Sequence, residues 1–220
     1  MRHFSFDDMI GGMALLFKFR GTANQVPAHR HQNPDGTLGG WVADTAGVGE
    51  AAYVGKNAQV FGRAIVTDNA KVLGFAMVWD RVLLKQEAVV GGRAAIKGDV
   101  VIDGRAHVGG HAFVDDVAMI GEEAVVYGKA IVRDNARIVG RARVCGLSTI
   151  SGEAFVTNDA WVFGEAKIGG TALIGGRARI GDKWIIEQGH YSTPMSNPRD
   201  ILDWLDEVAS VAELDASIGR

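Results

Sequence analysis

Six residues with charged or aromatic side chains lie at multiples of eighteen positions from one another: Tyr53, Lys71, His107, Arg143, Trp161 and Arg179. A cation beside an aromatic ring favours an anionic or nucleotide-like ligand, because the cation pairs with phosphate and the ring stacks on a base. A strand of nucleic acid would find the same features. The opposing interpretation is a mixed solvated surface, since the acids Glu87, Glu123 and Asp159 are interspersed among these residues.

His107 and His111 are candidate catalytic residues. An imidazole with an ordinary pKa near 6.5 can serve as a general base toward a hydroxyl or an amine. Spacing identifies no acidic partner for either residue. The alternative is therefore a pair of surface histidines without a catalytic role.

Two further histidines, His29 and His31, lie two positions apart in the segment AHRHQN. On a strand they would share one face and could chelate a metal ion, but no further ligand cluster is near them. A zinc ion that acidifies water needs three neutral imidazoles, and His107 and His111 supply two at most. We therefore expect a solvated polar loop at AHRHQN and no metal site.

A six-residue repeat runs without insertion or deletion from Val42 to Ile186 and contains most of the residues above. Its first position is always Val, Ile or Leu, and its third is mostly Gly, Asp or Asn. Its fifth position is Ala with few exceptions, which are Val82, Val100, Ser148 and Trp184.

A helix cannot use this repeat, because six residues turn by about 600° and the aliphatic positions would spiral around the axis. In a strand, the fifth and first positions lie two apart and point to the same face. The third position then forms a turn, since Gly, Asp and Asn tolerate positive φ. The sequence predicts an all-β parallel solenoid of short strands and corners.

Three hexads per coil would give a triangular cross-section and about eight coils, roughly 38 Å long at about 4.8 Å per strand. Sorting the outward sixth positions by eighteen defines three walls. The first wall has Gly47, Ile65, Leu83, Val101, Met119, Arg137, Phe155 and Leu173; the second has Tyr53, Lys71, Val89, His107, Val125, Arg143, Trp161 and Arg179; the third has Gln59, Met77, Ala95, Phe113, Ile131, Thr149, Lys167 and Ile185.

The first wall carries an apolar strip that points away from the core: Ile65, Leu83, Val101, Met119, Phe155 and Leu173. Monomers rarely leave such a strip in water. Full burial of six such side chains would contribute roughly 9–18 kcal/mol at about 1.5–3 kcal/mol each, before the costs of association. We expect a subunit interface here, with coverage by the N-terminal arm or the C-terminal helix as the alternative.

The run V-x-G-x-A-x resembles the hexapeptide-repeat proteins, whose left-handed β-helices have three hexads per coil. A narrower likeness begins at GTLGGWVADTAGVGEAAYVGKNAQVFGRA and covers about residues 36 to 186. It is to a group from bacteria and their phages, described mostly as hexapeptide-repeat or transferase-like. Left-handedness is implied by this resemblance alone, because the general preference for right-handed crossovers predicts the opposite hand.

The resemblance implies a homotrimer, although a homodimer that pairs the strip with itself stays open. It also implies acyl transfer from acyl-CoA with His107 or His111 as base, or zinc-dependent hydration of the γ-carbonic-anhydrase type. Acyltransferases of this fold commonly extrude a loop from the coils to build the acceptor site, and this repeat has no interruption.

The ends of the solenoid need covers, because terminal coils expose an unpaired edge and an open core. We expect residues 1–41 to form a capping arm, residues 42–186 the β-helix and residues 187–220 a linker with a capping helix from about 198 to 214. Trp184 is expected to plug the core. The apolar residues of the helix recur at helical spacing, and we expect them to pack on the prism or on a neighbouring subunit.

Composition narrows the function classes. A net charge of −3 and one cysteine, Cys145, favour a cytoplasmic protein without disulfides and without general affinity for nucleic acid or anionic membranes. The apolar run Met9–Phe17 follows two acids and is too short to cross a bilayer. The G-x-x-x-x-x-G matches are corner glycines of the repeat and not phosphate loops.

The leading hypothesis is a non-catalytic oligomeric scaffold, possibly-phage in origin by the likeness above, that binds a protein or a small molecule and needs no cofactor. The alternative is a hexapeptide-repeat acyltransferase that uses acyl-CoA.

Overall fold

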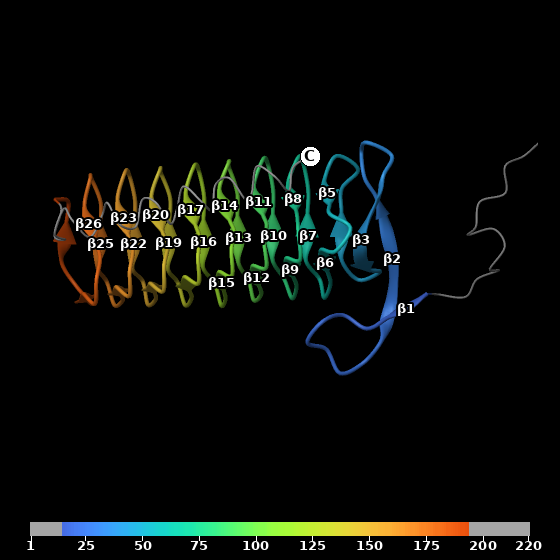
Figure 1. The fold of residues 1–220 in the computed structure, drawn as a ribbon, viewed down its shortest axis with the longest axis horizontal. Helices are drawn as coiled ribbons and strands as arrows, with labels where there is room; N and C mark the ends of the chain where they lie inside the picture. The colour runs from blue at the N-terminus through green and yellow to red at the C-terminus, as the bar shows by residue number, and fades with distance from the viewer. Residues whose placement is uncertain (1–14, 194–220) are drawn as a thin grey trace, which may run out of the picture.

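The computed structural model describes residues 15–193, which form a three-sided parallel β-solenoid of about eight coils (Figure 1). Each coil contributes one two-residue strand to each wall, and strands eighteen residues apart pair in parallel. The predicted all-β solenoid with three hexads per coil is therefore confirmed. In this part of the chain, no helix is long and apolar enough to cross a membrane.

The three walls are the three sheets of the structure. The first wall is β4 (Gly47–Val48), β7 (Ile65–Val66), β10 (Leu83–Leu84), β13 (Val101–Ile102), β16 (Met119–Ile120), β19 (Arg137–Ile138), β22 (Phe155–Val156), β25 (Leu173–Ile174) and β28 (His190–Tyr191). The second wall is β5 (Tyr53–Val54), β8 (Lys71–Val72), β11 (Val89–Val90), β14 (His107–Val108), β17 (Val125–Val126), β20 (Arg143–Val144), β23 (Trp161–Val162) and β26 (Arg179–Ile180). The third wall is β1 (Leu16–Phe17), β2 (Val26–Gln32), β3 (Leu38–Ala43), β6 (Gln59–Val60), β9 (Met77–Val78), β12 (Ala95–Ile96), β15 (Phe113–Val114), β18 (Ile131–Val132), β21 (Thr149–Ile150), β24 (Lys167–Ile168) and β27 (Ile185–Ile186).

The interior of the prism is filled by the first and fifth positions of the repeat. From Ala52 to Ile180 these side chains are almost completely buried in one continuous cluster. Ser148, which replaces an alanine, is buried as well, and its hydroxyl donates a hydrogen bond of 2.8 Å to the carbonyl of Cys145. The hydroxyl is thereby satisfied, which removes the main cost of burying a polar group.

The corners form where the third position adopts a left-handed backbone. Every third position from Gly62 to Asp182 has positive φ, as the residue types predict. At Gly128 a side chain would also clash, because an added Cβ would lie 2.9 Å from the backbone N and O of Gly146 in the next coil. Glycine is thus required there by both conformation and space.

Charged side chains pair between adjacent coils. Ion pairs of the solenoid join residues eighteen apart: Arg81 with Asp99, Lys85 with Asp103, Lys97 with Asp115, Arg105 with Glu123, Arg141 with Asp159, and Glu165 with Lys183. The corner acids act likewise, since the Asp134 carboxylate accepts a hydrogen bond of 2.8 Å from the Gly152 amide. Each coil therefore helps to fix the register of the next.

The N-terminal arm adds β1 and β2 in antiparallel order to the edge of the third wall. Its aromatic residues pack on the outer face of that wall in a continuous series. Phe17 stacks on Trp41, Phe19 stacks on Phe61, and Phe61 stacks in turn on Trp79. The described part of the arm thus packs its rings on the third wall and not on the apolar strip of the first.

The arm also satisfies the exposed edge of the second wall. The side-chain amide of Asn33 accepts a hydrogen bond of 2.9 Å from the Val54 amide and donates one of 3.3 Å to the Val54 carbonyl. A ring nitrogen of His31 lies 3.1 Å from the carbonyl of Ala52. These two buried side chains replace the missing neighbour strand.

His29 and His31 do not share a face, which corrects the expectation from their spacing. A β-bulge interrupts the pairing of β2 with β3 between Arg30 and Gln32. His31 is buried at the first coil, whereas His29 is exposed with its Nδ1 atom 2.9 Å from Asp44. Residues 15–193 contain no group of three His, Cys, Asp or Glu side chains that could hold a metal ion.

The C-terminal end of the core is covered differently from the expectation. Trp184 is 42% exposed, so the prediction that it plugs the core is wrong. The chain instead loses one residue of the repeat, which pairs Tyr191 with Ile174 and packs its ring against the core. The helix expected at about residues 198–214 lies outside the described residues.

Candidate ligand-binding surface

The six residues first noted in the sequence all lie on the second wall. The paired register places Tyr53, Lys71, His107, Arg143, Trp161 and Arg179 on successive or alternate coils. At about 4.8 Å per coil, however, Tyr53 is about 29 Å from Trp161. The set therefore forms no single site, and only Arg143, Trp161 and Arg179 lie on adjacent coils.

Trp161 lies between two arginines. The guanidinium carbon of Arg143, one coil earlier, is 5.9 Å from the centre of the indole ring, and that of Arg179, one coil later, is 5.1 Å from it. The ring is held in place because its Nε1 atom donates a hydrogen bond of 3.2 Å to the Cys145 sulfur. Cation–π contacts of this kind orient guanidinium groups without consuming their hydrogen-bond donors.

Beside these arginines lies an aromatic platform, which we define as Tyr127, Cys145, Trp161 and Phe163. Glycines in neighbouring coils make room for its rings. An added Cβ at Gly181 would lie 2.2 Å from the Phe163 ring, and one at Gly109 would lie 2.8 Å from Tyr127. The rings can therefore lie close against the backbone of the wall.

Two further arginines come from the corner between the first and second walls. Arg141 and Arg177 join Arg143, Asp159, Trp161 and Arg179 around a cleft of about 420 Å³, which we call the arginine cleft. Arg141 pairs with Asp159 through two contacts of 2.8 and 3.0 Å. Four guanidiniums and one carboxylate leave the cleft with a net positive charge, which suits an anionic ligand.

A second cleft, of about 480 Å³, follows the same corner toward the N-terminus. It is lined by Gly104, Arg105, Glu122, Glu123, Gly140, Arg141, Asn158 and Asp159. Acids outnumber arginines here, and Arg105 pairs with Glu123. The arginine cleft is therefore distinguished by its charge and not by its size.

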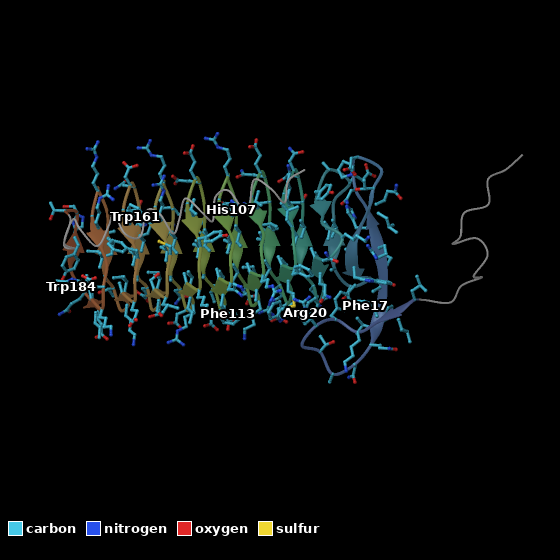
Figure 2. All side chains as sticks on the ribbon, in the orientation of Figure 1. Phe17, Arg20, His107, Phe113, Trp161 and Trp184 are labelled. Atoms are coloured by element: carbon cyan, nitrogen blue, oxygen red, sulfur yellow. The ribbon has the colours of Figure 1, made fainter. Side chains whose placement is uncertain are left out.

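The structure places the two candidate catalytic histidines on different surfaces. His107 is on the second wall, with its ring centre 6.5 Å from that of Tyr127, and Figure 2 shows it on the same side of the prism as Trp161. His111 is exposed at the corner between the second and third walls. Two imidazoles so separated do not form one acid–base centre.

Sequence reasoning missed Arg141 and Arg177 as parts of the site. Both occupy the fourth position of a hexad, at a corner, and the wall sorting considered only sixth positions. The signal was present, since Arg141, Arg177 and the wall residues Arg143 and Arg179 form two R-x-R segments eighteen times two positions apart.

The apolar strip of the first wall is aligned as predicted, with its members paired coil to coil. Ile65 is 50% exposed, and the other members, Leu83, Val101, Met119, Phe155 and Leu173, are half-buried. The strip is interrupted by Arg137, whose guanidinium lies 5.3 Å from the centre of the Phe155 ring.

A scan against family models finds no match for this chain, and a search of curated proteins finds none either. The solenoid, with about eight coils and three parallel sheets, is consistent with a hexapeptide-type β-helix.

Proposed function

We propose that this protein is a non-catalytic, oligomeric solenoid scaffold that binds an anionic partner in the arginine cleft of the second wall. The observation that carries the proposal is the arrangement of Arg143 and Arg179 about Trp161, with Arg141 and Arg177 at the adjacent corner. Guanidinium groups bind phosphate and carboxylate oxygens through paired N–H donors, and the fixed indole offers a stacking surface beside them.

Rigidity supports a binding role. The residues of the cleft stand on strands whose backbones are hydrogen-bonded from coil to coil, for example from the Arg143 amide to the Ala160 carbonyl at 2.9 Å. Little order has to be gained when a ligand binds such a surface, so more of the interaction free energy remains as affinity.

Oligomerisation through the first wall is the second part of the proposal. The strip is half-exposed, and the rings of the arm pack on the third wall instead. We propose a homotrimer of left-handed solenoids on the strength of the resemblance to hexapeptide-repeat proteins, with a homodimer as the other closed arrangement.

The acyltransferase alternative has weaker support. The repeat extrudes no loop between Val42 and Ile186, and His107 and His111 lie on different surfaces. Titration with coenzyme A tests this alternative directly, because an acyltransferase must bind it.

Calorimetric titration of the full chain with inorganic pyrophosphate tests the binding proposal. We expect saturable binding of one pyrophosphate per chain that weakens as salt is added. Absence of binding at low salt would overturn the proposal.

A further inference from the structure

We propose that the C-terminal segment, residues 198–214, docks in cis on the second wall as an amphipathic helix and places its carboxylates at the arginine cleft. The helix is a sequence prediction, and the docking surface is the aromatic platform with its neighbouring arginines. The inference concerns the occupant of this surface, and its consequence for ligand binding rests on the proposed function.

The platform has the character of a surface that is covered. Tyr127, Cys145, Trp161 and Phe163 lie on the outer face of the sheet, yet they form an apolar cluster separate from the core. Cys145, Trp161 and Phe163 are each at most 5% exposed. Clusters of this kind on the outside of a sheet are typical of a docking site for another element.

The end of the described chain leads to this surface. Residue 193 follows β28, which pairs with β25 at the last coil of the first wall. In preceding coils the chain passes from the first wall to the second within six residues, as from Ile174 to Ile180. A segment that begins at residue 198 therefore begins near β26.

The length of the segment matches the length of the site. A helix of seventeen residues is about 26 Å long at 1.5 Å per residue. This length spans about five coils at about 4.8 Å each. Starting beside Arg179 and running back toward the N-terminal coils, it would end near His107 and cover the whole platform.

The two surfaces are complementary in polarity and charge. Ile201, Leu205, Val208 and Ala212 recur at spacings of four and three, which places them on one helical face suited to the platform. Along one edge of that face lie Asp200, Asp203 and Glu207, again at helical spacing. The arginine cleft lies along one edge of the platform, at the corner with the first wall.

Docking in cis is favoured over docking on a second copy because the tether is short. Five residues separate Ser192 from Pro198, and a short tether gives an effective local concentration in the millimolar range. The tail carboxylates would then occupy the guanidiniums that the proposed anionic ligand needs. The segment would act as an internal competitor that the ligand must displace.

Disulfide trapping in the full chain tests this inference, since Cys145 is the only cysteine and belongs to the platform. At about three residues per coil, position 205 would lie opposite Cys145. We expect Leu205→Cys to form an intramolecular disulfide with Cys145 under mild oxidation. The matched control Ser210→Cys, on the opposite helical face, should not form it, and circular dichroism checks that both variants fold.

A disulfide-linked dimer of Leu205→Cys would assign the surface to a second copy and overturn docking in cis. Equal trapping of both variants, or of neither, would also overturn it. None of these outcomes depends on a ligand, so they are independent of the binding proposal. If pyrophosphate binds, it should slow trapping of Leu205→Cys, and an unchanged rate would overturn the role of the segment as a competitor.

Discussion

The guanidinium carbon of Arg179 lies 5.1 Å from the centre of the Trp161 ring, one coil away from it in the stack. The contact exists because the second wall holds residues eighteen apart side by side at a constant spacing. Arg143 meets the same ring from the other neighbouring coil. A strictly repeated backbone thus brings together side chains that are far apart in sequence.

Removal of one arginine should weaken anion binding more than it affects the fold. A hydrogen bond to a charged group contributes about 1.5–3 kcal/mol, so Arg179→Gln should raise the Kd for pyrophosphate by roughly 10- to 100-fold. Calorimetry measures this change. Arg63→Gln, at a different corner, is the control and should leave the Kd unchanged; equal effects of both variants would argue for a nonspecific charge effect.

Gly128→Ala should destabilise the solenoid. A left-handed backbone costs a residue with a Cβ roughly 1–2 kcal/mol, and here the new atom would also press on Gly146. Urea unfolding measures the loss. Asp134→Ala provides the comparison, because Asp134 already carries a Cβ at a φ of 61° and loses only its bond to the Gly152 amide. The account is contradicted if Asp134→Ala proves the more damaging of the two.

A charged residue in the strip of the first wall should separate the subunits. Leu83→Asp or Phe155→Asp would place a carboxylate where the proposed interface excludes water, and this cost exceeds the gain from the remaining contacts. Light scattering should give a multiple of the 23.4 kDa chain mass for the wild type and a smaller mass for either variant. A wild type that is already monomeric at micromolar concentration would refute the interface.

The pair of Arg81 and Asp99 should be visible in a pH titration. The hydrogen bond from the Arg81 guanidinium holds the pKa of the Asp99 carboxyl below its usual range. This lowered pKa means that the pair stabilises the fold above the ordinary pKa of an aspartate, and that the contribution is lost as the pH falls through the lowered value. Carbon NMR of the carboxyl should show a higher pKa in Arg81→Gln and no change in Arg141→Gln.

Much of the fold followed from the sequence because the repeat constrains it at every sixth residue. The alternation of Val or Ile with Ala fixed the inward face, and Gly, Asp and Asn marked the corners with positive φ. The ends departed from expectation. The β-bulge in β2 separates His29 from His31, and a loss of one residue before Tyr191 gives it the covering role expected of Trp184. Neither local change is encoded in a repeat.

The site was only partly predictable for a similar reason. The wall positions Arg143, Trp161 and Arg179 were found by their spacing, whereas Arg141 and Arg177 belong to corners. Corner side chains reach around the edge of the prism onto the neighbouring wall. That reach depends on side-chain direction at a turn, which spacing alone does not specify.

The most direct test of anion binding at the arginine cleft is a proton–nitrogen NMR titration that follows the Trp161 indole, assigned through Trp161→Phe. We predict that inorganic pyrophosphate shifts the Trp161 indole signal and leaves that of Trp79, which lies on the third wall, in place. Saturable binding of pyrophosphate that leaves the Trp161 signal unmoved would contradict the account.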